Sequence, residues 1–416
     1  MAVNNFTNTS LVCANVLRLM LNKLVVADYF DRTVQPEFEK EMAYGTTVFK
    51  KFPQLYIPSD GMGYQPQGIS RLQTPVTLNQ WVQIAFEWDD FETALKLERS
   101  EEELEENYFE PAAAAMAQEW DSRCAKFAYQ NASMLVGVLG TDPASVQTYY
   151  QGRQRLLEAA CNQTKLCMIT SSSMMTTLGA NITTVFHPGD EIDRMWRKGF
   201  IGELAGFKFF ESQSLYSHTA GTWAGTTGYP IISGAGQSGT SLIITANVGD
   251  TFNVGDKFSI ANVNRVNAMT RRTAGPLTVR TFTITQALTA VGGAGGDTIN
   301  FLPPIYGPGS QYQNVDALPA NAAALTLWPG TTSPNGKSGT VALGLSREAF
   351  ALVGTKLYDP TSVESHGVMQ DPDTGLSIRK VVFWDPVRSL RGNRIDSLGG
   401  FGNLYQDRGA VAVAAS

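Results

Sequence analysis

The feature that most constrains this chain is a long stretch without glutamate in its second half. Glu is absent between Glu211 and Glu348, and residues 222–340 hold 17 of the chain's 39 glycines. Runs of β-forming residues alternate there with Gly, Asn, Asp and Pro, which is the pattern of strands separated by turns. Four strands are predicted, at residues 241–245, 257–260, 278–285 and 298–302. The segment therefore has the character of a small all-β module of barrel or sandwich type.

A hexapeptide occurs twice in succession within this module. Residues 247–252 are Asn-Val-Gly-Asp-Thr-Phe, and residues 253–258 are Asn-Val-Gly-Asp-Lys-Phe. Two copies are too few for a solenoid. Because Gly and Asp favour turns and Phe favours strands, we interpret the copies as consecutive turns that enter strands. The predicted core of the module is made of large apolar residues: Leu242, Ile244, Phe258, Ile260, Val279, Phe282, Ile284, Ile299 and Phe301.

The sequence on both sides of the module mixes helices and strands. Helices are predicted at residues 9–27, 111–134, 146–160, 191–197 and 346–353, and strands at 166–170 and 376–383. In the second helix, Pro111 suits the first position, and Met116, Trp120, Phe127 and Met134 recur on one face. A β-module inside such a chain indicates domain insertion, which surface loops tolerate. The predicted fold class is therefore α+β with an inserted all-β, barrel-like domain.

Residues 43–88 predict a long β-hairpin with a Gly- and Pro-rich tip at 59–70. The return limb alternates, with apolar residues on one face, namely Val76, Leu78, Val82, Ile84, Phe86 and Trp88. Trp81 is an exception, because it falls on the face of Thr77, Asn79, Gln83 and Glu87. An isolated two-stranded hairpin is marginally stable in water, so this one must lie on its own domain or on a neighbour.

Residues 87–110 carry eleven acidic and two basic side chains, a net charge of −9 against −6 for the whole chain. A metal site needs oxygen ligands that converge from several elements, and a run of adjacent Glu does not supply them. We interpret the segment as a solvated helix face. No cluster of Lys and Arg gives a nucleic-acid footprint elsewhere in the sequence.

The cysteines indicate a reducing environment. All four are interpreted as free buried thiols, because neither a CxxC pair nor a nearby His pair accompanies them: Cys13, Cys124, Cys161 and Cys167. We therefore expect folding in a cytoplasm. Residues 1–10 lack the basic start of a signal peptide, and the apolar stretch at 11–26 is too short and too polar to span a bilayer.

Two patterns resemble chemical motifs. Residues 234–239 match GxGxxG, but a strand-like segment follows where phosphate binding requires a helix, so we interpret them as a boundary loop. His187 lies close to Asp190 and Glu191, but the intervening Pro-Gly predicts a surface turn rather than a metal site. His218 and His366 lack a nucleophile or ligand at motif spacing.

The sequence therefore predicts no catalytic residue, no cofactor-binding residue, no metal ligand and no cofactor. Walker A, GxSxG, HExxH and paired CxxC motifs are all absent. The absence of these motifs disfavours an enzyme but does not exclude one, because catalytic groups can lie far apart in sequence. An adhesin-like phage or cell-surface binding protein that uses the β-module stays open, and so does an enzyme with dispersed catalytic residues.

Three sets of residues, together with the order of the predicted elements, carry a resemblance to a known family. They are 82–88 (Val-Gln-Ile-Ala-Phe-Glu-Trp) with 94–98; 254–260 with Pro304-Ile-Tyr306 and 311–315; and 376–379 (Leu-Ser-Ile-Arg). With the predicted arm, hairpin, long helix and inserted module, the chain resembles the major capsid (coat) protein family of tailed bacteriophages, in its short-tailed lambdoid branch. The resemblance spans nearly the whole chain.

The resemblance implies a Hong-Kong-97-like capsid fold with named regions. These are an N-terminal arm at 1–35, an extended loop at 36–92, a peripheral domain with the spine helix at 93–139, an axial domain at 140–222 and 341–375, the inserted β-domain at 223–340, and peripheral C-terminal strands at 376–416. The loop tip at 59–70 contains no Lys. This disfavours the Lys–Asn cross-link that some capsids of this fold form.

The resemblance also implies function and partners. The chain would be a structural protein without enzymatic activity, and it would assemble with itself, as hexamers and pentamers, into an icosahedral shell of the virion. A scaffolding protein would guide assembly in the bacterial host cytoplasm, and a portal protein would admit double-stranded DNA, which the shell would meet by non-specific proximity. No membrane partner is implied.

Overall fold

The structure is a computed structural model. It describes residues 9–36, 46–52, 54–58, 60–69, 72–89, 105–162, 165–182, 202–223, 230–273, 279–292, 296–327, 336–371, 374–405 and 409–414. The chain divides into two units. The first unit contains residues 1–50, 73–124 and 350–403, and the second contains 51–72, 125–349 and 404–416.

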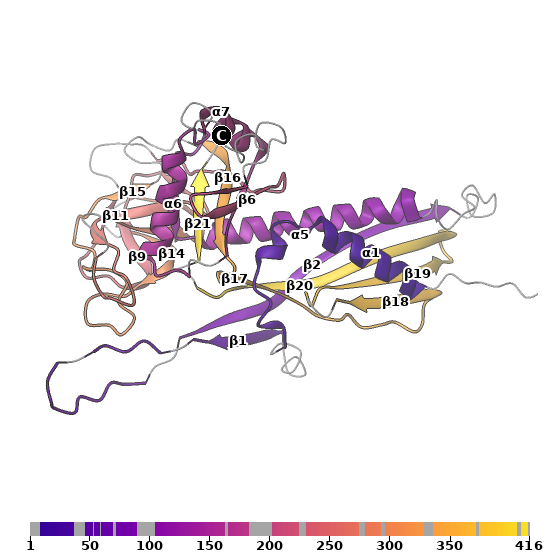
Figure 1. Cartoon of the computed structure of the whole chain (residues 1–416), viewed down its shortest axis with the longest axis horizontal. Coiled ribbons are helices and arrows are strands. Elements are labelled where there is room, and N and C mark those ends of the chain that lie inside the picture. The colour runs from indigo at the N-terminus through magenta and orange to yellow at the C-terminus, as the bar shows by residue number, and fades with distance from the viewer. Residues whose placement is uncertain are drawn as a thin grey trace, which may run out of the picture. The chain divides into compact units, whose positions relative to one another are not determined.

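The first unit is built on a six-stranded sheet in the order β1-β2-β20-β19-β18, with β17 also paired to β20 (Figure 1). The strands are β1 (Thr47–Lys51), β2 (Gln73–Asp89), β17 (Phe350–Gly354), β18 (Ser365–Gln370), β19 (Ser377–Asp385) and β20 (Leu390–Asn403). Strand β2 pairs with β20 from Val76↔Gly402 to Asp89↔Leu390, with a bulge between Leu78 and Gln80. The return limb of the predicted hairpin therefore lies inside a sheet of its own chain.

Helices of the first unit pack on this sheet. They are α1 (Thr9–Lys23), the short helix η1 (Ala27–Tyr29), the π-turn η3 (Glu105–Phe109) and the start of α5 (Glu110–Asn131), within which the unit boundary falls. Trp120 of α5 is fully buried and meets the sheet at Gly399, where a Cβ would lie 2.6 Å from the indole ring. Asp121 accepts hydrogen bonds from the backbone N–H groups of Val25 (2.8 Å) and Ala27 (3.0 Å). The helix thereby fixes the chain as it leaves α1.

The boundaries of both predicted long helices need correction. Helix α1 ends at Lys23 rather than at residue 27, because the chain turns there into η1. Helix α5 ends at Asn131, and Met134 lies in strand β3. The predicted helix at 191–197 lies outside the described residues. Residues 90–104, which make up most of the acidic segment, also lie outside them.

The second unit contains a seven-stranded sheet in the order β3-β21-β16-β4-β6-β5, with β7 paired to β16. Its strands are β3 (Met134–Val136), β4 (Leu166–Thr170), β5 (Glu203–Leu204), β6 (Phe207–Glu211), β7 (Ser217–Thr219), β16 (Ser338–Ser346) and β21 (Ala410–Ala414). Helices α6 (Val146–Glu158) and α7 (Ser172–Ile182) contribute Tyr149, Leu156, Met174 and Leu178 to a core shared with Phe209.

The helix predicted at residues 346–353 is wrong. The chain there leaves β16 at Ser346 and enters β17, a strand whose five residues are all buried. A fully buried strand shows no alternation, so its periodicity does not distinguish it from a helix. Pairing of Phe350 with Asn403 and of Gly354 with Gly399 overrides the local helix propensity.

The second sheet of the second unit is a closed barrel, with strand order β15-β11-β12-β14-β9-β8. The strands are β8 (Ile231–Ile232), β9 (Gly239–Thr245), β11 (Lys257–Asn264), β12 (Val279–Ile284), β14 (Asp297–Ile305) and β15 (Leu325–Leu327), beside a separate pair, β10 (Thr251–Phe252) and β13 (Leu288–Thr289). Closure follows from hydrogen bonds that Leu325 N–H donates to Pro230 and Ile232 N–H donates to Ala323. All four predicted strands occur, so the expected barrel-like sheet is present.

The barrel has a core of its own. Eight of the nine predicted core residues are buried, and Val279 alone is half-buried. Phe258, Phe282 and Phe301 form a three-ring cluster with centroid separations of 5.2–5.7 Å. Full burial of each large apolar side chain contributes about 1.5–3 kcal/mol before conformational entropy is subtracted. The burial pattern therefore supports the expected α+β fold with an inserted barrel.

Candidate functional site

The hexapeptide repeat folds as two equivalent turns. In each copy, the Asp N–H donates to the Asn carbonyl at 3.1 Å, and the Asn N–H donates to the Asp carboxylate (Asn247 to Asp250, 3.0 Å; Asn253 to Asp256, 2.7 Å). The Gly before each Asp has a positive φ, +87° and +96°, which glycine adopts without steric cost. The interpretation as consecutive turns that enter strands is therefore confirmed.

The two turns also form the same backbone hydrogen bonds with one partner segment, at positions six residues apart in that segment. The first exchanges hydrogen bonds with Ala290, through Gly249 N–H and the Asp250 carbonyl. The second exchanges the matching pair with Ile284, through Gly255 N–H and the Asp256 carbonyl. The spacing of Ile284 and Ala290 equals the repeat length, so one local structure is used twice on one partner segment.

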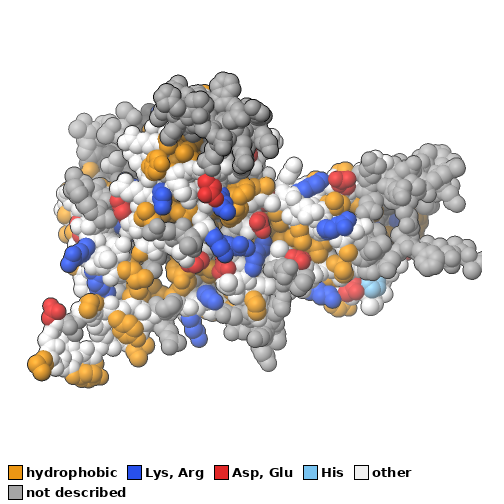
Figure 2. All heavy atoms as spheres, in the orientation of Figure 1, with side chains coloured by type: hydrophobic (Ala, Val, Ile, Leu, Met, Phe, Trp, Pro, Cys, Tyr) orange, Lys and Arg blue, Asp and Glu red, His pale blue; other side chains and the backbone are white. Residues whose placement is uncertain are grey.

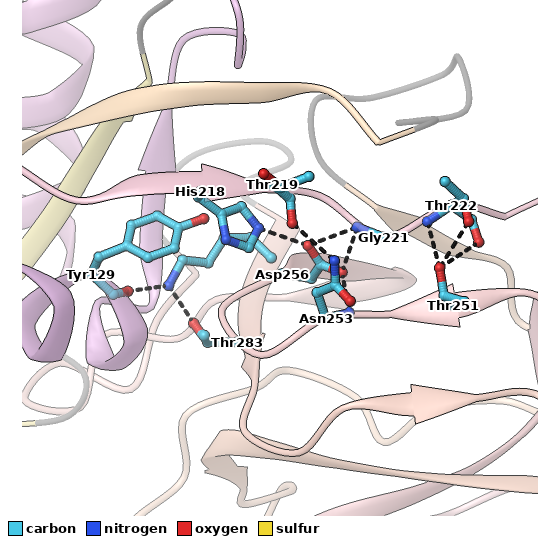
Figure 3. Close-up of polar contacts among 10 residues, drawn as sticks. Tyr129, His218, Thr219, Gly221, Thr222, Thr251, Asn253, Asp256 and Thr283 are labelled. Carbon is cyan, nitrogen blue, oxygen red and sulfur yellow. Dashed lines mark hydrogen bonds and ion pairs between the residues drawn. The ribbon is translucent and has the colours of Figure 1, made fainter.

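The second copy contributes Asp256 to a buried polar cluster (Figure 3). The Asp256 carboxylate is 2.8 Å from His218 Nε2 and accepts the N–H of Gly221 at 3.1 Å. Both side chains are almost fully buried. A Cβ at Gly221 would lie 2.1 Å from the Thr251 carbonyl oxygen, so only glycine fits there. The cluster fixes residues 217–222, which lead from β7, against both turns of the repeat.

Lys257 follows directly in the second copy and is fully buried. Its Nζ donates to the carbonyls of Tyr129 (2.6 Å) and Ala132 and to Thr283 Oγ1 (2.8 Å), and it lies 4.5 Å from the centre of the Tyr129 ring. Burial lowers the pKa of Lys257 well below its ordinary value, and the negative charge of Asp256 opposes this shift. Three acceptors match the three donors of an ammonium group, so the geometry is built for the charged form.

These contacts supply what helix α5 lacks. An α-helix ends with unpaired carbonyls and a partial negative charge, and α5 has no basic residue in its last turn. Lys257 provides the missing cation from the barrel. The hydroxyl of Thr283 donates to the Ala132 carbonyl at 2.9 Å, and that of Thr281 donates to the Ser133 carbonyl. We call Lys257, Thr281 and Thr283 with their carbonyl partners the helix latch.

The chemistry of this cluster is structural. The Tyr129 ring packs against His218 with centroids 4.9 Å apart and the ring planes tilted by 42°, and burial raises the pKa of the Tyr129 hydroxyl well above its ordinary value. The Asp256 carboxylate is occupied by backbone and imidazole donors. Within the described ranges, no group of three or more His, Cys, Asp or Glu side chains could hold a metal ion. What the arrangement can do is hold the barrel on the end of α5.

The sequence-predicted motifs lie elsewhere or take other roles. His187, Asp190 and Glu191 lie outside the described residues. His366 pairs with Asp359 at 2.6 Å in a partly exposed contact. The GxGxxG match ends at Gly239, where β9 begins, so a strand follows it as expected.

The four cysteines are free, as expected. Cys13, Cys124 and Cys167 are buried, whereas Cys161 is only half-buried, which corrects that part of the prediction. Burial raises the pKa of Cys13 and Cys124. Both thiols therefore stay protonated and unreactive at neutral pH.

No helix among the described ranges is long and apolar enough to cross a membrane.

The helix latch was not foreseen from the sequence. Lys257 stands in a predicted strand, and a Lys in such a place is ordinarily expected to face solvent. One signal was present: the two hexapeptides differ at one position, with Thr251 in the first copy and Lys257 in the second. A charged residue that breaks an otherwise identical repeat indicates a special environment.

Comparison with known proteins identifies the family. A family model described as "P22 coat protein - gene protein 5" matches residues 1–335, which is well over half of the chain. A search among curated proteins finds no match.

Solved capsid structures resemble the chain more distantly. A chain from Mycobacterium phage Che8 has 12% identity and a TM-score of 0.46, with 94% of this chain and 90% of that chain covered. The capsid of the cyanophage P-SCSP1u has 10% identity and a TM-score of 0.43, with coverage of 89% and 84%. The capsid of Ralstonia phage GP4 has 7% identity and a TM-score of 0.42, with the same coverage. At these TM-scores the likenesses carry no argument of their own, and the assignment rests on the family match. The chain belongs to the P22 coat protein family, and it is a tailed-phage major capsid protein that forms the virion shell rather than an enzyme.

Proposed function

We propose that the subunit assembles as hexamers and pentamers of an icosahedral shell, and that an extended loop within residues 36–92 binds a neighbouring copy. The observation that carries this proposal is the loop between β1 and β2, whose described residues within 52–72 form neither helix nor strand and which Figure 1 draws as a long open segment. A shell subunit buries such segments against identical partners, because symmetric assembly repeats each contact.

The loop displays apolar side chains to solvent (Figure 2). Tyr56, Met62, Tyr64 and Ile69 are 69%, 107%, 93% and 79% exposed. Monomeric proteins seldom expose several large apolar residues on one segment without a binding role. The exposure therefore supports a role of the loop in binding.

The two limbs of the loop are nevertheless held in place. Gln54 Nε2 donates to the Gly68 carbonyl at 3.0 Å, and the Gln67 side chain both accepts from and donates to the backbone of Ile57. Gln311, which lies between β14 and β15 of the barrel, donates its Nε2 to the Leu55 carbonyl. Such bonds reduce the conformational entropy that the loop loses on binding. The loop is thus preorganised for a partner.

The test is assembly after removal of the tip. Replacement of residues 59–70 by Asn-Gly should leave the circular dichroism and thermal melt of the free subunit nearly unchanged, because the tip contributes little core. The yield of particles in sedimentation should fall steeply. Met62→Ser provides a milder variant, and Met269→Ser is its control, since Met269 is 65% exposed on the barrel. Loss of soluble folded subunit after tip removal, or equal effects of the two Met variants, would contradict the proposal.

The proposed partners are those of a phage shell: a scaffolding protein during assembly, a portal protein, and packaged double-stranded DNA. Support comes from membership of the coat protein family, and the short-tailed lambdoid branch is proposed on the same ground. Co-expression with the neighbouring gene products tests this. Closed particles of uniform size should form only with the scaffolding partner, and uniform particles from the subunit alone would remove that partner from the proposal.

The sheets refine the proposed domain boundaries. Strands β17 and β18 lie in the six-stranded sheet of the first unit, whereas the family resemblance implies an axial domain that includes residues 341–375. Strand β21 lies in the seven-stranded sheet of the second unit, whereas the resemblance implies a peripheral domain that includes 376–416. We therefore propose that residues 350–403 complete the peripheral domain, and that β16 and β21 complete the axial domain. The arm at 1–35 and the inserted domain at 223–340 keep their proposed bounds.

A further inference from the structure

An exposed tryptophan in the first unit lies beside two arginines on the face of its sheet. The guanidinium carbons of Arg379 and Arg394 are 5.6 Å and 5.9 Å from the centre of the Trp81 ring. Trp81 is 40% exposed, and tryptophan is a residue type enriched at binding interfaces. The three residues come from β2, β19 and β20, which are adjacent strands of one sheet.

A buried carboxylate organises this group. Asp396 is fully buried and accepts from Arg379 Nη2 (2.5 Å), Arg394 Nε (2.6 Å) and Trp81 Nε1 (3.3 Å). A buried charge that is hydrogen-bonded on both oxygens holds its partners in fixed orientations. The ring and both guanidinium groups are therefore preorganised before any ligand arrives.

The two arginines differ in how many of their N–H groups are available to a ligand. Arg379 also donates Nη1 to the Tyr358 carbonyl, so its main donors are occupied. Arg394 uses only Nε, and its two Nη groups make no hydrogen bond to any described residue. Its side chain is 39% exposed. A planar fork with two free donors matches the oxygens of a phosphate.

We propose that Trp81 and Arg394 form a binding site for single-stranded nucleic acid, with a backbone phosphate on the Arg394 fork and a base stacked on Trp81. The pairing of an aromatic platform with an arginine is the recognition mode of single-stranded sites, and it favours nucleic acid over an acidic peptide. The chain's net charge of −6 gives no general attraction for phosphate, so binding must come from this local arrangement.

The same strand supplies a matched control. Arg391 is 38% exposed, nearly the value of Arg394, but its Nη2 already pairs with Glu364 at 2.7 Å. Among the described residues, Arg391 makes no cation–π contact with Trp81. Arg391→Ala therefore removes the same formal charge from the same strand without touching the proposed site. Arg394→Ala leaves Asp396 paired with Arg379, so the fold should persist.

The experiment measures binding of a fluorescent oligothymidylate of about 12 nucleotides to the unassembled subunit at low salt. Arg394→Ala should weaken binding about tenfold, Arg394→Lys should restore it only in part because the fork is lost, and Arg391→Ala should change it less than about twofold. Trp81→Phe should weaken binding and remove the quenching of tryptophan fluorescence by the ligand. Circular dichroism confirms that each variant is folded.

Three results would overturn the proposal: no binding by the wild-type subunit, equal losses for Arg394→Ala and Arg391→Ala, or equally tight binding of an oligoglutamate peptide. The last result would make the site a carboxylate site for a protein partner. Because the assay uses free subunits, each of these outcomes leaves the proposed shell assembly standing. Failure to assemble after tip removal is in turn independent of Arg394.

Discussion

Replacement of the buried lysine of the helix latch tests how the barrel is held on α5. Lys257→Met keeps the length of the side chain but removes its charge and donors. The Ala132 carbonyl keeps the Thr283 hydroxyl, whereas the Tyr129 carbonyl keeps only a long bond of 3.3 Å from Ala132 N–H. The variant therefore leaves one buried carbonyl nearly unpaired.

The magnitude follows from these contacts. An unsatisfied buried carbonyl costs about 1–3 kcal/mol, and the cation at the helix end and over the ring adds about 1 kcal/mol. Relief of the desolvation of the ammonium offsets part of this loss. We expect a net loss of about 2 kcal/mol, which corresponds to a fall of about 4–8 °C in the melting temperature of a unit this large.

The loss should depend on pH with a definite sign. Because burial lowers the folded-state pKa of Lys257, the unfolded chain binds more protons between that pKa and about 10.5. Wild-type stability should therefore rise with pH in this window and fall as pH drops through the folded pKa. Lys257→Met removes that slope, so the difference between the two proteins should widen as pH rises.

Thermal and urea unfolding at several pH values would measure this. Lys337→Met is the control, because Lys337 is exposed in the same unit and should change stability by less than about 0.5 kcal/mol. Equal melting of wild type and Lys257→Met, or identical pH slopes, would refute the reasoning. In that case the barrel would be held by its apolar contacts rather than by the latch.

Three further changes have clear expected outcomes. Gly221→Ala forces a Cβ to 2.1 Å from the Thr251 carbonyl oxygen and should abolish soluble expression, whereas Gly179→Ala in α7, where the Cβ meets nothing within 4 Å, should raise the melting temperature slightly. Gln35→Met strips the buried Gly354 backbone of both its amide partners (2.8 and 2.9 Å) and should cost about 2–4 kcal/mol in urea unfolding, whereas half-buried Gln54→Met in the loop, whose hydrogen bond to Gly68 is exposed to solvent, should cost little. Residues 223–340 expressed alone should give dispersed amide signals in NMR and a cooperative melt, since the barrel closes on its own core; a collapsed spectrum would show that it folds only on the rest of the unit.

The sequence predicts which segments of the barrel form strands, but it does not predict the order in which those strands pair. Its strands alternate and are bounded by turn residues, which local sequence reveals. Their arrangement depends on pairings such as β9 with β14 and β8 with residues 323–325, which join segments far apart in the chain. For the same reason the pairing of β2 with β20 was missed, because about 300 residues of sequence separate the two strands and no local signal links them.

Errors occurred where burial removes the periodic signal. Residues 350–354 are buried on both faces, and they overlap the helix that the sequence wrongly predicts at 346–353. Asp121 and Lys257 are charged, and their positions inside the fold are stabilised by backbone groups that sequence does not locate. The contact of His218 with Asp256 joins residues 38 positions apart and shows no motif spacing.

The duplicated hexapeptide creates a hazard for folding that the latch removes. Thr251 opposes Thr289 and Lys257 opposes Thr283, so sliding the segment by one repeat would put the first copy in the place of the second and remake the hydrogen bonds of that turn with Ile284. The slipped state would bring Thr251 to the end of α5 and leave Lys257 without its three acceptors. A misplaced ammonium in an apolar interior is expensive, whereas the misplaced turns themselves are not. The single difference between the two hexapeptides thus gives the native and slipped registers different free energies, and it favours the native register of the capsid subunit.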